Sequence, residues 1–151
     1  MILMTYTIKE VADKVGLSIY TLRFYDKEGL LPFVVRNQAG YREFTDGDLN
    51  LIHTICCLKN TGMKISEIRS YIEDVMAGPA TIEHRKQILS AHRLKVVAEQ
   101  QKIAENLEEI DYKLNIYSAP DANEQVKQEL QYAVADKVNN HLENPYGAID
   151  G

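Results

Sequence analysis

The sequence has no tryptophan, only three phenylalanines, and no apolar run that approaches the roughly 20 residues needed to cross a bilayer. The segment from Met1 to Met4 is too short and too uncharged for a secretory signal peptide. The two cysteines, Cys56 and Cys57, are neighbours, and a bond between helical neighbours needs a geometry that a regular backbone does not offer. We therefore expect a soluble, cytoplasmic protein with no membrane partner and no structural disulfide.

The sequence also lacks an excess of positive charge, because its formal net charge is −5. Residues 1–77 hold nine Lys or Arg and ten Asp or Glu, whereas the remainder holds eight and twelve. The front half is thus nearly neutral. Any binding of nucleic acid must come from cations clustered on one face of it.

Two short helices are predicted near the start of the chain, joined by a tight turn. Thr7 and Glu10 have the spacing of a capping box, and Gly16 ends the helix that follows. Ser18 is placed to cap a second helix, which continues to about Lys27. This arrangement predicts a helix-turn-helix.

After Pro32 the pattern changes to that of strands. Residues 33–36 and 41–44 predict a small β-hairpin, or wing, with turn residues between them. Two further helices are expected, one over 45–62 and one over 65–76. The expected fold is mainly α with a small β-hairpin wing, which makes a winged helix-turn-helix.

One long helix is predicted from Thr81 to Tyr117, where the sequence contains neither Gly nor Pro. Such a long, polar helix needs a partner, and pairing with a second copy or packing along its own domain would supply one. A weaker helix follows. The expected divisions are 1–77 for the winged domain, 78–117 for the coiled-coil dimerisation helix, and 118–151 for a C-terminal helix and tail. Apolar residues recur every seven positions at Ile82, Leu89, Val96, Ile103, Ile110 and Tyr117.

The strongest motif lies between Tyr6 and Pro32. It contains the runs Tyr-Thr-Ile-Lys-Glu-Val-Ala and Gly-Leu-Ser-Ile-Tyr-Thr-Leu-Arg-Phe-Tyr-Asp-Lys-Glu-Gly-Leu-Leu-Pro. This stretch resembles the head of the MerR family of transcriptional regulators, and the likeness covers residues 5–117. The resemblance implies a sequence-specific regulator that binds double-stranded promoter DNA at a palindromic operator.

The same resemblance implies how such a regulator acts. Members pair as homodimers through an antiparallel coiled coil, which holds the two DNA-binding domains, or heads, at the half-sites. They distort an over-long promoter spacer so that RNA polymerase engages both promoter elements, which makes the polymerase an indirect partner. Activation and repression are both compatible with this mechanism.

The residues expected to contact DNA lie on the second helix, on the wing and on the third helix. Early, outward side chains of a recognition helix meet base edges and phosphates, and cations on the wing suit phosphates. For Tyr25 and Tyr41, packing in the core is the alternative. The expected set is Tyr20, Thr21, Arg23, Tyr25, Arg36, Tyr41, Arg42 and Lys59.

A candidate sensor lies on the third helix. Cys56 follows Ile52 by one turn beside the buried stripe, whereas Cys57 shares the polar face with His53. A protonated His53 would favour the thiolate of Cys57. The position resembles that of the sensor cysteine in the aldehyde- and thiol-stress-responsive branch. The alternative is that both cysteines only fill a helix interface.

The residues present exclude some other functions, such as metal sensing and catalysis, and leave others open. The metal-responsive branches carry cysteines near both ends of the dimerisation helix, and this sequence has none there, so we expect no metal and no cofactor. A regulator of a non-covalent ligand, a regulator without ligand and an architectural DNA-binding coiled coil remain alternatives. We expect no enzyme, because no phosphate loop, metal-ligand spacing or acid pair stands out.

Overall fold

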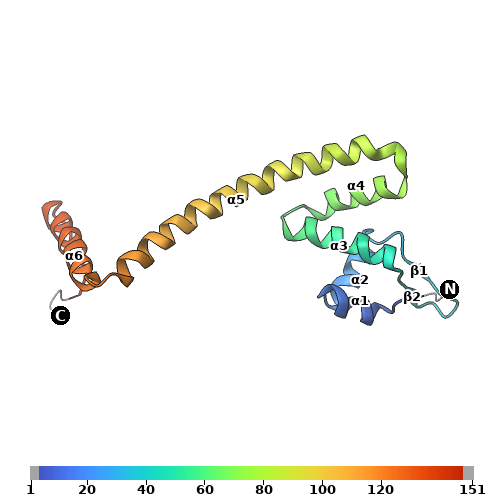
Figure 1. Cartoon of the computed structure of the whole chain (residues 1–151), viewed down its shortest axis with the longest axis horizontal. Helices are drawn as coiled ribbons and strands as arrows, with labels where there is room; N and C mark the ends of the chain where they lie inside the picture. The colour runs from blue at the N-terminus through green and yellow to red at the C-terminus, as the bar shows by residue number, and fades with distance from the viewer. Residues whose placement is uncertain (1–3, 148–151) are drawn as a thin grey trace. The chain divides into compact units, whose positions relative to one another are not determined.

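The structure is a computed structural model that describes residues 4–147, and the chain is mainly helical with one short hairpin (Figure 1). The fold class predicted from the sequence is confirmed. The chain divides into two compact units between Ala98 and Glu99. The elements are α1 (Ile8–Val15), α2 (Ile19–Lys27), β1 (Val35–Arg36), β2 (Arg42–Glu43), α3 (Asp46–Asn60), α4 (Ile65–Met76), the short 3₁₀ helix η1 (Pro79–Thr81), α5 (Ile82–Ser118) and α6 (Ala122–Asn139).

The helix-turn-helix forms from the local signals in its sequence. The Thr7 hydroxyl accepts a hydrogen bond from the Glu10 amide, and the Glu10 carboxylate accepts one from the Thr7 amide. Gly16 ends α1 in the left-handed region with a φ of 70°. The Ser18 hydroxyl then accepts from the Thr21 amide at 3.0 Å and caps α2.

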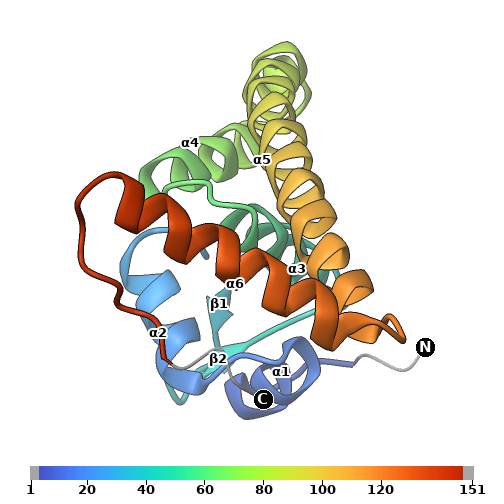
Figure 2. The same cartoon turned by 90° about the vertical axis from the view of Figure 1, so that its left-hand side faces the viewer.

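The core of the first unit lies beneath these two helices. Apolar faces of α1, α2, α3 and α4 meet there, and Ile88 and Leu89 at the start of α5 pack against its edge. Figure 2 gives a second view of α3 and α4 within this unit. The largest side chains that are fully buried are Phe44, Leu22, Leu30, Leu31, Ile52, Ile55, Ile68, Ile72 and Val11.

The wing is shorter than predicted. Its two strands pair antiparallel over two residues each, with Arg36 opposite Arg42. The Asn37 side chain accepts hydrogen bonds from the amides of Ala39 and Tyr41, so the residues between the strands form a turn instead of a longer ladder. An isolated bridge between Tyr6 and Phe44 ties the base of the wing to the start of the chain.

The second half of the structure is built from two helices. Helix α5 has 37 residues and begins one residue after the predicted Thr81, because residues 79–81 form η1. Helix α6 is the weaker helix expected after α5, and it ends at Asn139. No helix within residues 4–147 combines the length and the apolar character that crossing a membrane requires.

Candidate nucleic-acid interface

A hollow of about 280 Å³ opens between the start of α1, helix α2 and the wing. Four of the predicted DNA-contacting residues line it: Arg23, Arg36, Tyr41 and Arg42. Residues 5–8 complete one side, so the start of α1 lies at the same surface. The nearly neutral front half therefore does gather cations on one face, as phosphate binding requires.

Three of these four side chains are available to solvent. Arg23 projects from α2 and is exposed. On the wing, the Arg36 Nη1 donates to the Gly40 carbonyl at 2.8 Å, which holds the guanidinium across the turn. Tyr41 is 72% exposed, so the alternative that it packs in the core is wrong.

Arg42 occupies a different environment. Its Nε donates to Asp26 Oδ2 at 2.7 Å, and its side chain is only 17% exposed. This ion pair joins the wing to α2, because Asp26 lies in the last turn of that helix. Arg42 thus positions the wing, and its contact with DNA stays a prediction.

The remaining predicted contacts lie outside the hollow. Tyr20 is 82% exposed on α2, and Lys59 is exposed in the last turn of α3. The Thr21 hydroxyl is hydrogen-bonded to the Ser18 hydroxyl at 2.9 Å. Tyr25 is buried in the core, where burial and, secondarily, Cys56 raise its pKa. The packing role of Tyr25 is therefore observed, whereas its contact with DNA stays a prediction.

We expect the substitution Asp26→Asn to weaken operator binding by about threefold, although it removes a negative charge beside the hollow. The physical reason is that Arg42 loses its charged partner and the wing loses an anchor to α2. Titration of labelled operator DNA measures the effect, with Asp13→Asn on the exposed face of α1 as the control. Tighter binding by Asp26→Asn would mean that charge alone governs this surface.

The two adjacent cysteines on α3 have different environments, as predicted. Cys57 is exposed, whereas Cys56 is half-buried against the core. Burial, and secondarily the neighbouring Cys57, raises the pKa of the Cys56 thiol, which lowers its thiolate fraction at neutral pH. His53 is exposed one turn earlier, and residues 4–147 show no hydrogen bond between it and Cys57.

The structure adds one contact to this region that the sequence did not reveal. Thr61 Oγ1 lies 2.8 Å from the Cys57 carbonyl and 2.7 Å from His92 Nε2 on α5. A hydroxyl has one proton, so when Thr61 donates to the carbonyl, His92 is the donor to Thr61. No local pattern signals a contact across 31 residues.

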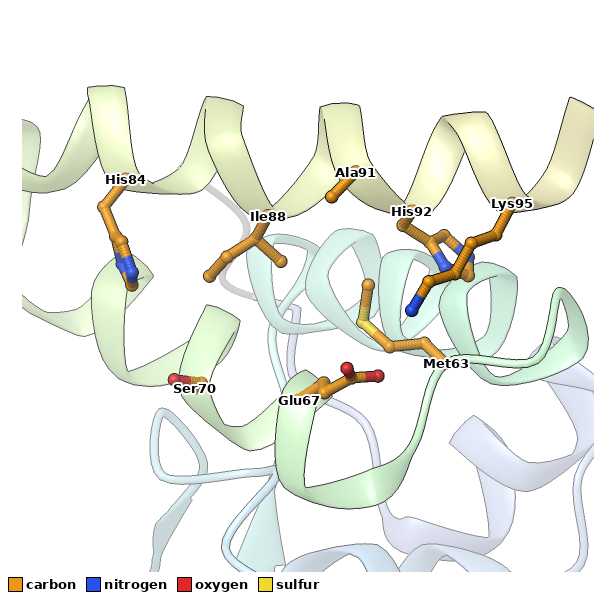
Figure 3. A pocket seen from close by; sticks show the side chains of 8 residues that line it. All are labelled: Met63, Glu67, Ser70, His84, Ile88, Ala91, His92 and Lys95. Carbon is orange, nitrogen blue, oxygen red and sulfur yellow. The ribbon is translucent and has the colours of Figure 1, made fainter.

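A pocket of about 270 Å³ begins beside this contact. Figure 3 shows Ile88, His92 and Lys95 reaching into it from α5, opposite Met63 and Glu67. Its lining mixes apolar surface with polar groups. Within residues 4–147, no cluster of three or more His, Cys, Asp or Glu side chains suits a metal ion.

Comparison with known proteins places this arrangement in a family. The model for the MerR HTH family regulatory protein matches residues 6–75. An uncharacterized HTH-type transcriptional regulator from Haemophilus influenzae is 43% identical over 124 residues, which cover 82% of this chain and 92% of that protein.

Two solved structures are also similar. The crystal structure of HiNmlR, a MerR family regulator lacking the sensor domain, bound to promoter DNA, shares 44% identity and covers 76% of this chain and 90% of that one, with a TM-score of 0.70. A MerR family transcriptional regulator from Bacillus thuringiensis shares 40% identity over 74% of this chain and 98% of that one, with a TM-score of 0.69. The chain belongs to the MerR family of helix-turn-helix transcriptional regulators.

Proposed function

We propose that this chain works in the cytoplasm as a homodimer that binds a palindromic promoter site and regulates transcription by distorting the DNA. The observation that carries the proposal is the convergence of Arg23, Arg36 and Tyr41 on one hollow between α2 and the wing. A solved relative with 44% identity is bound to promoter DNA, which supports the same use of this surface. The relatives are transcriptional regulators, and we propose no catalytic activity.

The dimer is proposed to form through α5, within the pairing segment 78–117. Apolar side chains of the seven-residue repeat are exposed in the single chain, including Ile103 at 59% and Ile110 at 55%. Leu107 and Leu114 lie beside them and are also exposed. A second copy would remove this apolar surface from water, and residues 1–77 would remain as the reading head.

The charges along α5 favour antiparallel pairing. Residues 82–98 carry four Lys or Arg and one Glu, whereas residues 99–118 carry five Asp or Glu and two Lys. Antiparallel helices set the basic half of one copy against the acidic half of the other, and parallel helices set like charges together. The antiparallel dimer presents its two heads at opposite ends and is two-fold symmetric, and a palindrome requires that symmetry.

Selection of binding sites from random DNA tests this function. We expect the selected sites to be palindromes, with one dimer bound to each duplex. Because the dimer deforms the site, a fluorescence pair at the ends of the duplex should report a bend or twist on binding. Sites without symmetry, or binding that is equal on all sequences, would instead favour the architectural alternative.

Within this function, we propose Cys57 as the sensor, with His53 in a supporting position. The support is the exposure of the Cys57 thiol in the last turns of α3, beside the Thr61 and His92 contact that joins α3 to α5. Covalent modification of Cys57 would add bulk at this junction between the head and the pairing helix. Modification of the thiol would then change how the head is held on the pairing helix, and with it the geometry of the dimer.

We expect Cys57→Ser to abolish the response of a reporter promoter to formaldehyde or a quinone while DNA binding is retained. Cys56→Ser is the matched control, and it should respond as the parent does because the Cys56 thiol is half-buried with a raised pKa. Mass spectrometry of the treated protein should place the adduct on Cys57. A full response in Cys57→Ser would instead favour a non-covalent ligand, for which the pocket beside His92 is available.

A further inference from the structure

The corner between α4 and α5 joins the DNA-binding head to the pairing helix. Helix α4 ends at Met76, and Gly78 follows with a φ of 85°, a positive value that favours glycine, before the chain enters η1. The last carbonyls of a helix have no partners within it, so the end of α4 needs donors from elsewhere. All residues of this corner belong to the first compact unit.

Arg85, in the first turn of α5, supplies these donors. Its Nη2 lies 2.7 Å from the Gly78 carbonyl, 3.1 Å from the Asp74 carbonyl and 3.5 Å from the Val75 carbonyl. Its Nε donates to the Thr81 hydroxyl at 3.0 Å. That hydroxyl in turn lies 2.9 Å from the Gly78 carbonyl. One planar guanidinium thus binds the end of α4, the turn and the start of α5 together.

Beyond the corner, α4 and α5 are held apart. The pocket of about 270 Å³ lies between them, with Glu67 and Ser70 on one side and Ala91 and Lys95 on the other (Figure 3). Along this stretch α5 contacts the head through Ile88 and Leu89 at the edge of the core and through His92, which lies 2.7 Å from Thr61, whereas the end of α4 is joined to the start of α5 by the hydrogen bonds at the corner. Near the corner, His84 contacts Asp74, which adds to the hydrogen bonds of Arg85.

We propose that Arg85 is a positioning residue that fixes the direction in which α5 leaves the head, and thereby the separation of the two heads on DNA. This inference rests on the proposed antiparallel dimer. A point about 20 Å from the corner, which lies within the span of a domain of this size, moves about 3.5 Å when the head turns by about 10°. That displacement is about one base-pair step. A rotation of this size at the corner therefore changes the half-site spacing at which both heads of the dimer contact DNA.

The test measures operator affinity as a function of half-site spacing. Duplexes carry the palindrome selected by the parent protein, with one or two base pairs inserted or removed at its centre. We expect the parent to lose at least about tenfold in affinity for each base pair of mismatch. Arg85→Ala should lose less than about threefold, because its heads adjust to the spacing.

A second arginine provides a matched control. Arg69 donates to the Glu28 carbonyl at 2.6 Å, so it also binds a backbone carbonyl beyond a helix end, but its partners all lie inside the head. Arg69→Ala should keep the steep spacing profile of the parent even where it lowers thermal stability. Thr81→Val removes one hydrogen-bonding group from the same corner and keeps Arg85. It should flatten the dependence of affinity on half-site spacing by a smaller amount than Arg85→Ala. If Arg85→Ala does not fold, Thr81→Val serves as the test variant.

The outcomes separate this inference from the proposed function. A parent protein that binds no palindrome would overturn both. A parent with a steep profile, together with an equally steep profile in Arg85→Ala and Thr81→Val, would overturn the role of Arg85 alone. Sedimentation of each variant checks that the dimer is intact, so that a flattened profile reports the head geometry and not dissociation.

Discussion

Arg23→Ala is expected to weaken binding of the selected operator by about 10- to 100-fold while leaving thermal stability unchanged. Arg23 lies on the outward face of α2 and lines the hollow between that helix and the wing. Within residues 4–147 it makes no hydrogen bond or ion pair, so its removal takes nothing from the fold. The loss of affinity would therefore report a contact with DNA directly.

Fluorescence anisotropy with the operator and with an unrelated duplex measures this effect and its origin. If Arg23 contacts a base edge, Arg23→Ala loses more affinity for the operator than for the unrelated duplex. If Arg23 contacts a phosphate, the affinities for both duplexes fall and the salt dependence of binding becomes shallower. Lys64→Ala is the control, because Lys64 is exposed on the same unit but does not line the hollow. Equal losses in the two variants would contradict this use of the surface.

Phe44→Ala should lower the free energy of unfolding by about 3–5 kcal/mol. The Phe44 side chain is fully buried where the wing meets the core. Its backbone also exchanges hydrogen bonds with Tyr6, at 2.8 and 2.9 Å, so a cavity at this point would loosen the base of the wing. We expect operator binding to fall as well, since Arg36 and Tyr41 lie on that wing.

Urea denaturation at a fixed protomer concentration measures the change, because the stability of a dimer depends on concentration. Phe24→Ala is a matched control: the Phe24 side chain is 48% exposed on α2, and its removal should cost less than about 1 kcal/mol. Similar losses in the two variants would show that the wing is not anchored through Phe44.

The elements that could be predicted from the sequence are those with local causes. The Thr7 capping box, Gly16 and Ser18 lie within a few residues of the structure they produce, so α1, α2 and their turn follow from them. The absence of Gly and Pro after Thr81 similarly predicts α5. The burial of Tyr25 could also be predicted, because Tyr25 follows the buried Leu22 by three residues and so lies on the same face of α2.

The parts that could not be predicted depend on side chains far apart in the sequence. Asp26 and Arg42 are 16 positions apart, and nothing in the sequence indicates that the wing folds back so that they form an ion pair. The contact of Thr61 with His92 and the hydrogen bonds of Arg85 form across the turn at residues 79–81, which brings α5 back beside α3 and the end of α4. Length and charge do not encode such a turn.

Transcription in vitro on paired templates tests the central claim most directly. One template carries the operator within an over-long promoter spacer, and the other carries the same operator in a spacer of normal length. If the dimer acts by deforming DNA, adding it should raise transcription from the first template and should not raise it from the second. Equal stimulation of both templates would contradict the account, since it would mean that the protein recruits polymerase without changing the shape of the promoter.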